Sequence, residues 1–140
     1  MKKINLIITP FLLLMVFACA ETKKEVNDPD PEHLTIGTFN IAWLGDGIED
    51  RIMREEEHYS RIADVISTTG ADILALQEVE NEKALQRVLK YLKDYNCHVS
   101  KGGGPLNLAV IYKNTVDMEI IGDYNPLIVE KNRTRPGLLF

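Results

Sequence analysis

The sequence predicts an α/β domain, because short apolar runs of strand length alternate with stretches whose apolar residues recur at helical spacing. Ile73–Leu76 is an apolar run too short for a helix, and Gln77 and Glu78 follow it directly. An earlier run, Leu34–Ile41, also delivers a polar side chain, Asn40, from an apolar strand. Because ligands of α/β folds bind outside the carboxyl ends of the strands, Asn40 and Glu78 are candidates for one site.

The first 19 residues have the pattern of an export signal. Lys2 and Lys3 precede an apolar run that ends at Ala18, shorter than the ~20 apolar residues that cross a bilayer. A small residue directly before Cys19 resembles a bacterial lipobox, so we expect cleavage before Cys19 and a lipid on this cysteine. The alternative is an ordinary cleaved signal with an accidental cysteine. In both cases the protein is expected to be exported, as a membrane-anchored lipoprotein or in secreted form.

Residues 20–33 predict a flexible linker, because they are rich in Glu, Lys, Asp and Pro and contain almost no large apolar residue. Removal of the signal takes Lys2 and Lys3 from the 16 basic residues, which leaves 14 against 21 acidic residues, a net charge of −7. Such a surface repels polyanions, which excludes broad electrostatic binding to nucleic acid. A phosphorylated substrate would therefore need a local site in which a metal ion supplies positive charge.

The domain is expected to begin with the strand at 34–41, followed by a loop over 43–47 whose glycines mark turns. A helix follows the charged stretch 49–57, and Gly70 is placed to end this helix as a C-terminal cap. The buried face of the helix is predicted by apolar residues at helical spacing: Tyr59, Ile62, Val65 and Ile66.

Asn81 is a candidate N-cap for a second helix, whose apolar stripe extends to Leu92 and which is expected to end near 95–96. The glycine-rich stretch 102–105 predicts a hairpin loop. Because the sequence ends within an apolar run, we expect the chain to be the N-terminal part of a longer protein. Further strands are predicted, in chain order, at 97–100, 108–112, 118–121 and 137–140.

Two motifs, Thr38-Phe39-Asn40-Ile41 and the stretch 71–81, follow each other at a spacing of about 40 residues. Residues 106–112 and the arginine-proline segment 134–138 come next. In this order the motifs resemble the endonuclease/exonuclease/phosphatase superfamily, which includes DNase I-like nucleases, abasic-site endonucleases, sphingomyelinases and inositol polyphosphate phosphatases. The resemblance covers nearly all of residues 34–140. It implies the N-terminal half of a four-layer α/β sandwich, with two mostly antiparallel sheets and helices outside them.

The resemblance also implies a Mg²⁺-dependent phosphoesterase, with Mn²⁺ as an alternative ion. Members of the superfamily bind Mg²⁺ through a glutamate at the position of Glu78, assisted by an asparagine at the position of Asn40. An arginine at the position of Arg135 contacts the substrate phosphate, a task that suits the donor fork of a guanidinium. The simpler alternatives are that Glu78 caps the helix beginning near Asn81, that Asn40 satisfies a turn, and that Arg135 is an ordinary exposed arginine.

The catalytic residues of the superfamily are not all found in this sequence. Its Gly-Asp-x-Asn and Ser-Asp-His motifs lie further along, so we expect the general-base histidine and its partner aspartate to be absent and the 140-residue chain to be inactive. Gly122-Asp123-Tyr124-Asn125 matches the first motif but precedes Arg135, so we interpret it as a turn. The histidines occur in other sequence contexts: His33, His58 and His98.

The sequence therefore predicts a secreted or lipid-anchored, nuclease-like phosphodiesterase, present as an inactive N-terminal fragment. A lipid or inositol phosphate phosphoesterase is the first alternative. A non-catalytic surface lipoprotein with a degenerate site is the second alternative, from a different class of function. The expected partners are a phosphate ester substrate, with DNA as one candidate, and a membrane reached through the lipid on Cys19. The sequence indicates no protein partner.

Overall fold

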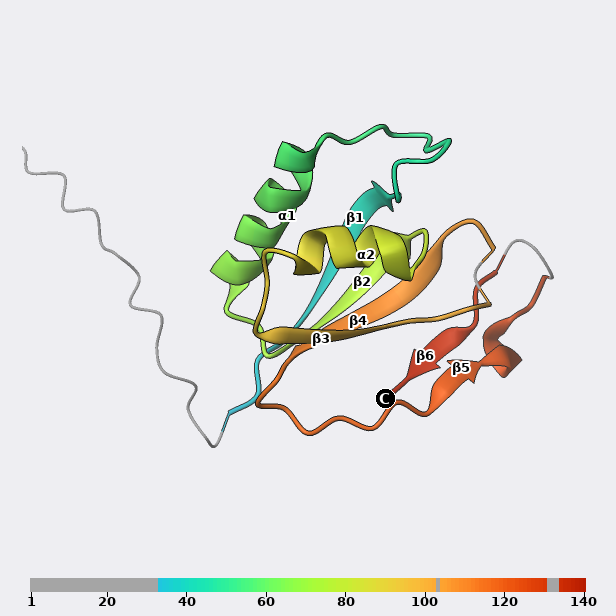
Figure 1. Cartoon of the computed structure of the whole chain (residues 1–140). Coiled ribbons are helices and arrows are strands. Elements are labelled where there is room, and N and C mark those ends of the chain that lie inside the picture. Colours follow the sequence, from blue (N-terminus) through green and yellow to red (C-terminus); the bar gives the residue numbers. More distant parts are fainter. Residues whose placement is uncertain (1–32, 103, 131–133) are drawn as a thin grey trace, which may run out of the picture.

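The computed structural model describes residues 33–102, 104–130 and 134–140 (Figure 1). The predicted export signal, its Cys19 and all but the last residue of the predicted linker lie outside the described residues, so these interpretations stay predictions. In the described part, two sheets and two α-helices form an α/β fold, which confirms the predicted fold class. Neither of these helices is long and apolar enough to span a membrane.

The larger sheet places the carboxyl ends of two parallel strands side by side. Strands β1 and β2 run parallel, whereas β4 is antiparallel to both β2 and β3. Because β1 and β2 end at the same edge of the sheet, side chains from their ends can meet there. The order across the sheet is β1 (Ile36–Leu44), β2 (Ile73–Val79), β4 (Asn107–Lys113) and β3 (Tyr95–Val99).

The helices α1 (Glu56–Thr69) and α2 (Glu82–Leu89) cover one face of this sheet (Figure 1). Leu74 and Leu76 of β2 point toward the helices and are only 2% and 0% exposed. Full burial of an aliphatic side chain of this size contributes about 1.5–3 kcal/mol. These leucines share one core with the apolar faces of the helices, which consist of Tyr59, Ala63, Ile66, Ala84, Leu85 and Val88.

Both residues predicted to cap a helix do so in the structure, one at the end of α1 and one at the start of α2. Gly70 adopts the left-handed conformation, with φ of 67°, and closes α1 as its C-terminal cap. The side chain of Asn81 accepts a hydrogen bond from the backbone N–H of Ala84 at 2.9 Å, which confirms Asn81 as the N-cap of α2. The predicted end of this helix near 95–96 is wrong, because α2 stops at Leu89 and β3 begins at Tyr95.

A second, smaller sheet pairs β5 (Gly122–Tyr124) with β6 (Gly137–Leu139) in antiparallel register. The predicted strand at 118–121 and the interpretation of 122–125 as a turn are both wrong. Residues 118–121 have no regular secondary structure, and the chain turns only at the 3₁₀ helix Asn125–Leu127. The physical reason is that pairing with a partner distant in the sequence, rather than local apolarity, decides where β5 forms. The hairpin predicted around 102–105 is confirmed, because this stretch connects β3 to its antiparallel neighbour β4.

Asp72 fastens the edge of the sheet opposite to the ends of β1 and β2. Its Oδ1 accepts a hydrogen bond from Lys113 Nζ at 2.9 Å, and its Oδ2 accepts one from the backbone N–H of Thr35 at 2.8 Å. The Lys113 ammonium and then the Thr35 amide hold the pKa of Asp72 below its ordinary value of 3.8. One buried carboxylate thus ties the segments that lead into β1 and β2 to the end of β4.

We predict that Asp72→Asn lowers the free energy of unfolding by about 1–2 kcal/mol at neutral pH, because asparagine keeps an acceptor but loses the charge that faces Lys113. Since the folded pKa of Asp72 is depressed, its stabilisation is complete above the unfolded value and is lost as the pH falls through the folded value. Urea unfolding at several pH values measures both effects. Asp64→Asn, on the exposed side of α1, is the matched control, and a loss that does not shrink in acid would contradict the electrostatic assignment.

Candidate metal-binding site at the ends of β1 and β2

The parallel pair of β1 and β2 ends in irregular backbone on both strands. Its register is regular up to Asn40 and resumes only at Leu44, so residues 41–43 of β1 face residue 78 of β2 alone. Ala42, Trp43 and Glu78 lie in the left-handed region, with φ of 54°, 62° and 63°. A non-glycine residue in this region costs about 1–2 kcal/mol, and such outliers concentrate at functional sites.

The irregular backbone brings the two predicted site residues into contact. Asn40 Nδ2 donates a hydrogen bond to Glu78 Oε1 at 3.0 Å, and the backbone N–H of Trp43 donates to Glu78 Oε2 at 3.2 Å. The Asn40 Oδ1 accepts from the backbone N–H of Ala42 at 2.8 Å. Reversing the Asn40 amide would break both of its contacts, so its N–H group faces the glutamate. Asn40 therefore does two things. Its side-chain oxygen satisfies the turn at Ala42, which is the simpler role considered above, and its N–H group orients Glu78.

Glu78 does not cap α2, the simpler alternative for this residue. Its carboxylate accepts hydrogen bonds from Asn40 and Trp43, whereas the N-cap of α2 is Asn81. The carboxylate is half-buried and remains accessible at the edge of the sheet. Its position suits a group that binds a ligand from solvent.

Arg54 holds the left-handed segment of β1 from its other side. Its Nη2 donates hydrogen bonds to the carbonyl oxygens of Ile41 and Ala42 at 2.9 and 2.8 Å, and its Nε lies 3.4 Å from the carbonyl oxygen of Trp43. In the two peptide groups that join Ile41, Ala42 and Trp43, the carbonyl oxygen thus faces Arg54. The N–H group of the first faces Asn40, and that of the second faces Glu78. This role of Arg54 was not predicted, because the residue lies in the charged stretch 49–57, whose pattern indicates the solvated approach to a helix.

Arg135 lies at the same edge of the sheet but makes no polar contact with Glu78 in the described residues. Its Nε donates a hydrogen bond to the carbonyl oxygen of Leu106 at 2.7 Å. Leu106 directly precedes Asn107, which pairs with Val79 at the end of β2. The guanidinium is therefore anchored beside the end of β2, and no further hydrogen bond to it is found in the described part of the chain.

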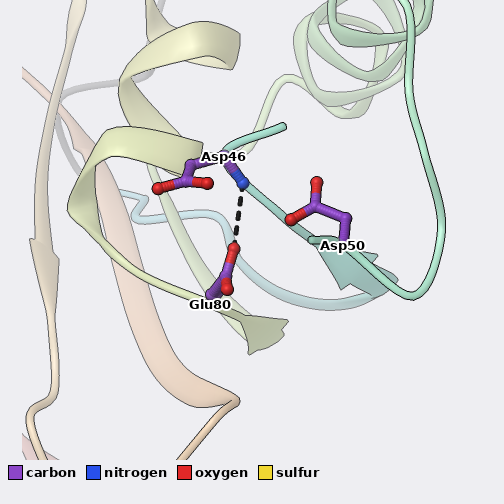
Figure 2. Close-up of side chains that lie close together, drawn as sticks. All are labelled: Asp46, Asp50 and Glu80. Atoms are coloured by element: carbon purple, nitrogen blue, oxygen red, sulfur yellow. Dashed lines mark hydrogen bonds between the residues drawn. The ribbon is translucent and has the colours of Figure 1, made fainter. Parts of the chain in front are cut away.

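An acidic cluster, formed by Asp46, Asp50 and Glu80, lies just beyond the ends of the same two strands (Figure 2). One carboxylate oxygen of each residue lies within 4.8 Å of the others. Burial raises the pKa of Glu80, and the N–H of Asp46 lowers it. The charges of Asp50 and Asp46, together with a side-chain contact with Asp50, raise it further. The cluster was not predicted from the sequence. In the sequence its members are marked only weakly. Asp46 and Asp50 lie on either side of the turn glycine Gly47, and Glu80 follows Glu78 by two residues.

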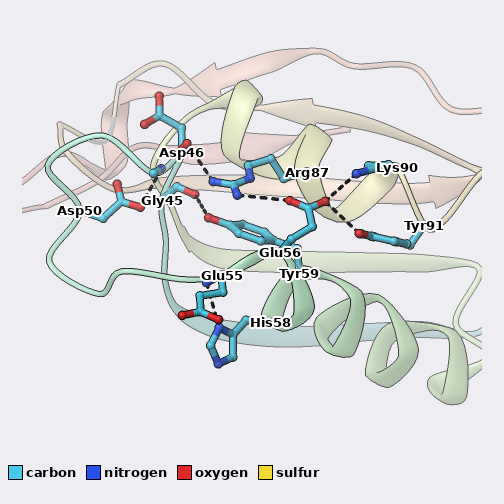
Figure 3. A network of polar contacts seen from close by, with 11 residues as sticks. Gly45, Asp46, Asp50, Glu55, Glu56, His58, Tyr59, Arg87, Lys90 and Tyr91 are labelled. Carbon is cyan, nitrogen blue, oxygen red and sulfur yellow. Dashed lines mark hydrogen bonds and ion pairs between the residues drawn. The ribbon is translucent and has the colours of Figure 1, made fainter.

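The loop that carries Asp46 is held by both helices (Figure 3). The Tyr59 hydroxyl donates a hydrogen bond to the carbonyl oxygen of Gly45 at 3.0 Å, and Arg87 Nη1 donates to the carbonyl oxygen of Asp46 at 3.1 Å. The Arg87 guanidinium also lies over the Tyr59 ring, 3.9 Å from its centroid. The loop is thus positioned by α1 and α2 rather than by its own sequence alone.

Glu56 connects the two helices behind this loop (Figure 3). Its carboxylate accepts hydrogen bonds from Lys90 Nζ at 2.7 Å, from the Tyr91 hydroxyl at 2.8 Å and from Arg87 Nη2 at 3.3 Å. The contacts with Lys90, Tyr91 and Arg87, in this order, lower the pKa of Glu56 to about 2. The same Arg87 therefore links the helix pair to the loop that carries Asp46.

No histidine hydrogen-bonds to Asn40 or Glu78 among residues 33–102, 104–130 and 134–140. His58 Nδ1 accepts a hydrogen bond from the backbone N–H of Glu55 at 3.0 Å and belongs to the capping box of α1. Asp123, from the tetrapeptide that matches Gly-Asp-x-Asn, accepts a hydrogen bond from the backbone N–H of Lys101 at 3.0 Å. The described residues at this site thus offer metal and phosphate ligands and no histidine for proton transfer.

The model of the Endonuclease/Exonuclease/phosphatase family matches residues 37–138, from β1 to β6. The chain belongs to this family. No curated protein and no solved structure shows a significant match to it. Members of the family are generally hydrolases that use divalent metals, and the carboxylates gathered at the ends of β1 and β2 suit this chemistry. Family membership confirms the resemblance inferred from the order of the motifs, whereas the individual roles of Glu78, Asn40 and Arg135 stay predictions.

We predict that Arg54→Met lowers the free energy of unfolding by about 1–3 kcal/mol, because two carbonyl groups lose a charged donor. It should also shift the backbone amide resonances of Ala42 and Trp43, whose N–H groups contact the site side chains. Urea unfolding and two-dimensional NMR measure the two effects. Arg51→Met, which removes an exposed arginine from the same loop, should change neither. Equal behaviour of the two variants would show that Arg54 does not position the site.

Proposed function

We propose that the protein is a Mg²⁺-dependent phosphoesterase, and in first place a nuclease-like phosphodiesterase, with Glu78 as its metal ligand. The observation that carries this proposal is the conformation of Glu78. It adopts a strained left-handed backbone, with φ of 63°, at the edge where parallel strands end, and Asn40 and Trp43 hydrogen-bond to both of its oxygens. A carboxylate that is held in this way is ready to bind a cation without further ordering.

The donors around Glu78 fit Mg²⁺. This ion keeps several waters and takes one or two carboxylates together with phosphate oxygens of the substrate. Glu78 provides such a carboxylate, and the Asn40 amide orients it without adding negative charge. Mn²⁺ would be held by the same oxygens. When bound, the ion would polarise the scissile phosphate and neutralise charge on the leaving oxygen.

The other proposed role belongs to Arg135, which would bind the substrate phosphate through the N–H groups not used by Leu106. Glu78, Asn40 and Arg135 bind and orient, and none of them is suited to take the proton of an attacking water at neutral pH. We therefore propose that the described residues hold the ion and the phosphate but do not complete hydrolysis. Export and the lipid on Cys19, with the membrane as partner, remain part of this proposal on the basis of the sequence.

A lipid or inositol phosphate is the second candidate substrate. The formal net charge of −5 disfavours DNA, which binds proteins largely through basic surfaces. The loop between β1 and α1, beside the site, also exposes apolar side chains: Ile48, Ile52 and Met53 are 69%, 41% and 65% exposed. Such side chains suit an amphiphilic substrate better than a nucleic acid. A surface lipoprotein with a degenerate site remains the alternative from a different class.

We predict that Glu78→Gln lowers the affinity for Mg²⁺ at least about tenfold, because it removes the charged ligand. A Mg²⁺ titration followed through the amide resonance of Trp43, which donates to Glu78, measures binding at this site alone. Glu119→Gln, at an exposed position, is the control. Unchanged Mg²⁺ shifts in Glu78→Gln would exclude Glu78 as the ligand and would favour the degenerate lipoprotein.

The class of substrate is tested by incubating the purified protein with plasmid DNA, an aryl phosphodiester and inositol phosphates, with Mg²⁺ or with EDTA. We expect each true substrate to perturb the resonances near Arg135 only when Mg²⁺ is present. We also expect no turnover by this chain, because the site shows no general base among the described residues. Robust Mg²⁺-dependent hydrolysis would refute the proposed inactivity and would leave the proposed metal site standing.

A further inference from the structure

The acidic cluster of Asp46, Asp50 and Glu80 contains a buried carboxylate oxygen without a partner. The Asp50 side chain belongs to a residue that is only 8% exposed. Its Oδ2 accepts a hydrogen bond from the backbone N–H of Gly47 at 2.9 Å, whereas its Oδ1 is buried and has no hydrogen-bond partner. Buried charges in proteins are paired or coordinate metals, so this oxygen is a candidate ligand for a cation.

The Asp50 carboxylate is aimed into the cluster and cannot easily turn away from it. Figure 2 shows one of its oxygens directed toward Asp46 and Glu80, which lie on the same side of Asp50. Behind it lies Gly45, where an added Cβ would stand 2.1 Å from the Asp50 Cγ. The carboxylate therefore rests directly on the backbone of the loop. The absence of a side chain at Gly45 is what gives it room.

The other two carboxylates are held in place by neutral donors. Asp46 Oδ1 accepts from the backbone N–H of Ile48 at 3.0 Å, and Asp46 Oδ2 accepts from Asn81 Nδ2 at 3.1 Å. Glu80 Oε2 accepts from the backbone N–H of Asp46 at 3.0 Å. These contacts fix the orientation of the oxygens but do not compensate their charge.

No basic side chain neutralises the cluster in the described part of the chain. The ion pairs found there involve Glu56, Glu57 and Asp72, and none involves Asp46, Asp50 or Glu80. The guanidinium of Arg87 approaches Asp46 only at its main-chain carbonyl oxygen and forms its ion pair with Glu56. Among the described residues, therefore, none of the three carboxylates forms an ion pair with a basic side chain.

We propose that Asp46, Asp50 and Glu80 bind a hard divalent cation, Ca²⁺ in first place, at a second site separate from Glu78. The ion would cross-link the loop after β1 to the end of β2. It would also be coupled to the start of α2, because Asp46 contacts the N-cap residue Asn81. The site goes beyond the proposed phosphoesterase function and does not depend on it.

The kind of donors at the cluster favours Ca²⁺ over Mg²⁺. Mg²⁺ requires a near-ideal octahedron and keeps several waters, whereas Ca²⁺ takes six to eight oxygens in a flexible geometry. The three carboxylate oxygens lie within 4.8 Å of one another, near enough for one cation to bind them together. Ca²⁺ also accepts irregular sets of carboxylate, carbonyl and water oxygens, as a loop of this kind provides.

The site is separate from Glu78 because Glu78, in β2, and Glu80, directly after β2, make different contacts. The carboxylate of Glu78 faces Asn40 and the amide of Trp43, whereas that of Glu80 faces the amide of Asp46. Between them, Val79 is fully buried in the core. Substitutions can therefore distinguish the two sites.

The test is a Ca²⁺ titration of the purified protein, followed by calorimetry, thermal unfolding and the amide resonances of Asp46 and Gly47, which donate to Glu80 and Asp50. We expect Ca²⁺ to shift both resonances, to raise the Tm and to bind more tightly than Mg²⁺. Asp50→Asn and Glu80→Gln should each weaken Ca²⁺ binding at least about tenfold. Asp50→Asn should also raise the Tm in EDTA, because it removes an uncompensated buried charge.

Two controls keep this proposal distinct from the proposed function. Glu78→Gln should keep the Ca²⁺ response, and Asp117→Asn, which removes an exposed acid, should keep it as well. Loss of the response in Glu78→Gln but not in Asp50→Asn would place the ion at Glu78 and overturn the proposal. An unmodified protein that shows no Ca²⁺ response would overturn it too, and would indicate that a proton shared by Asp50 and Glu80 neutralises the cluster instead.

Discussion

The structure around the site depends on one constraint: two peptide groups of β1 are held in a conformation that a regular strand does not allow. Their carbonyls are bound by Arg54, and their N–H groups are directed at Asn40 and Glu78. The same distortion interrupts the ladder between β1 and β2, so that Glu78 lies outside the regular pairing of the two strands. In a regular ladder Asn40 lies opposite Gln77, so the side chains of Asn40 and Glu78 would point to opposite faces of the sheet. The backbone strain and the clustering of polar side chains are therefore two aspects of one arrangement.

The loop after β1 depends on packing between helices in a comparable way. Arg87 lies between the Tyr59 ring, the Glu56 carboxylate and the main chain of Asp46, so the helix pair and the loop share one cationic group. A guanidinium suits this position, because it stacks on an aromatic face and still donates in its own plane. The acids of the loop are consequently fixed relative to the apolar core, although they lie at its border.

The sequence predicted those features that depend on local chemistry. Gly70 ends α1 because a residue without a side chain tolerates the left-handed conformation, and Asn81 begins α2 because its side chain accepts a hydrogen bond from a backbone N–H. Leu74 and Leu76 indicate a buried strand by composition alone. Features that depend on partners far along the chain were not predictable in the same way. Strand β5 forms where β6 can pair with it, and the roles of Arg54, Asp46 and Asp50 arise only when the loop folds back over the sheet. In a charged stretch or a glycine-rich loop, such residues look the same as solvated ones.

The contact between Asn40 and Glu78 spans 38 residues, and Arg54 lies between them. All the groups that shape the Glu78 carboxylate thus belong to a single β1–α1–β2 crossover, residues 36–79. These contacts form only when the chain between β1 and β2 is closed into a loop, which costs conformational entropy. The surroundings of Glu78 are accordingly built by one contiguous stretch of the chain, so a cation that binds Glu78 would stabilise the assembled crossover.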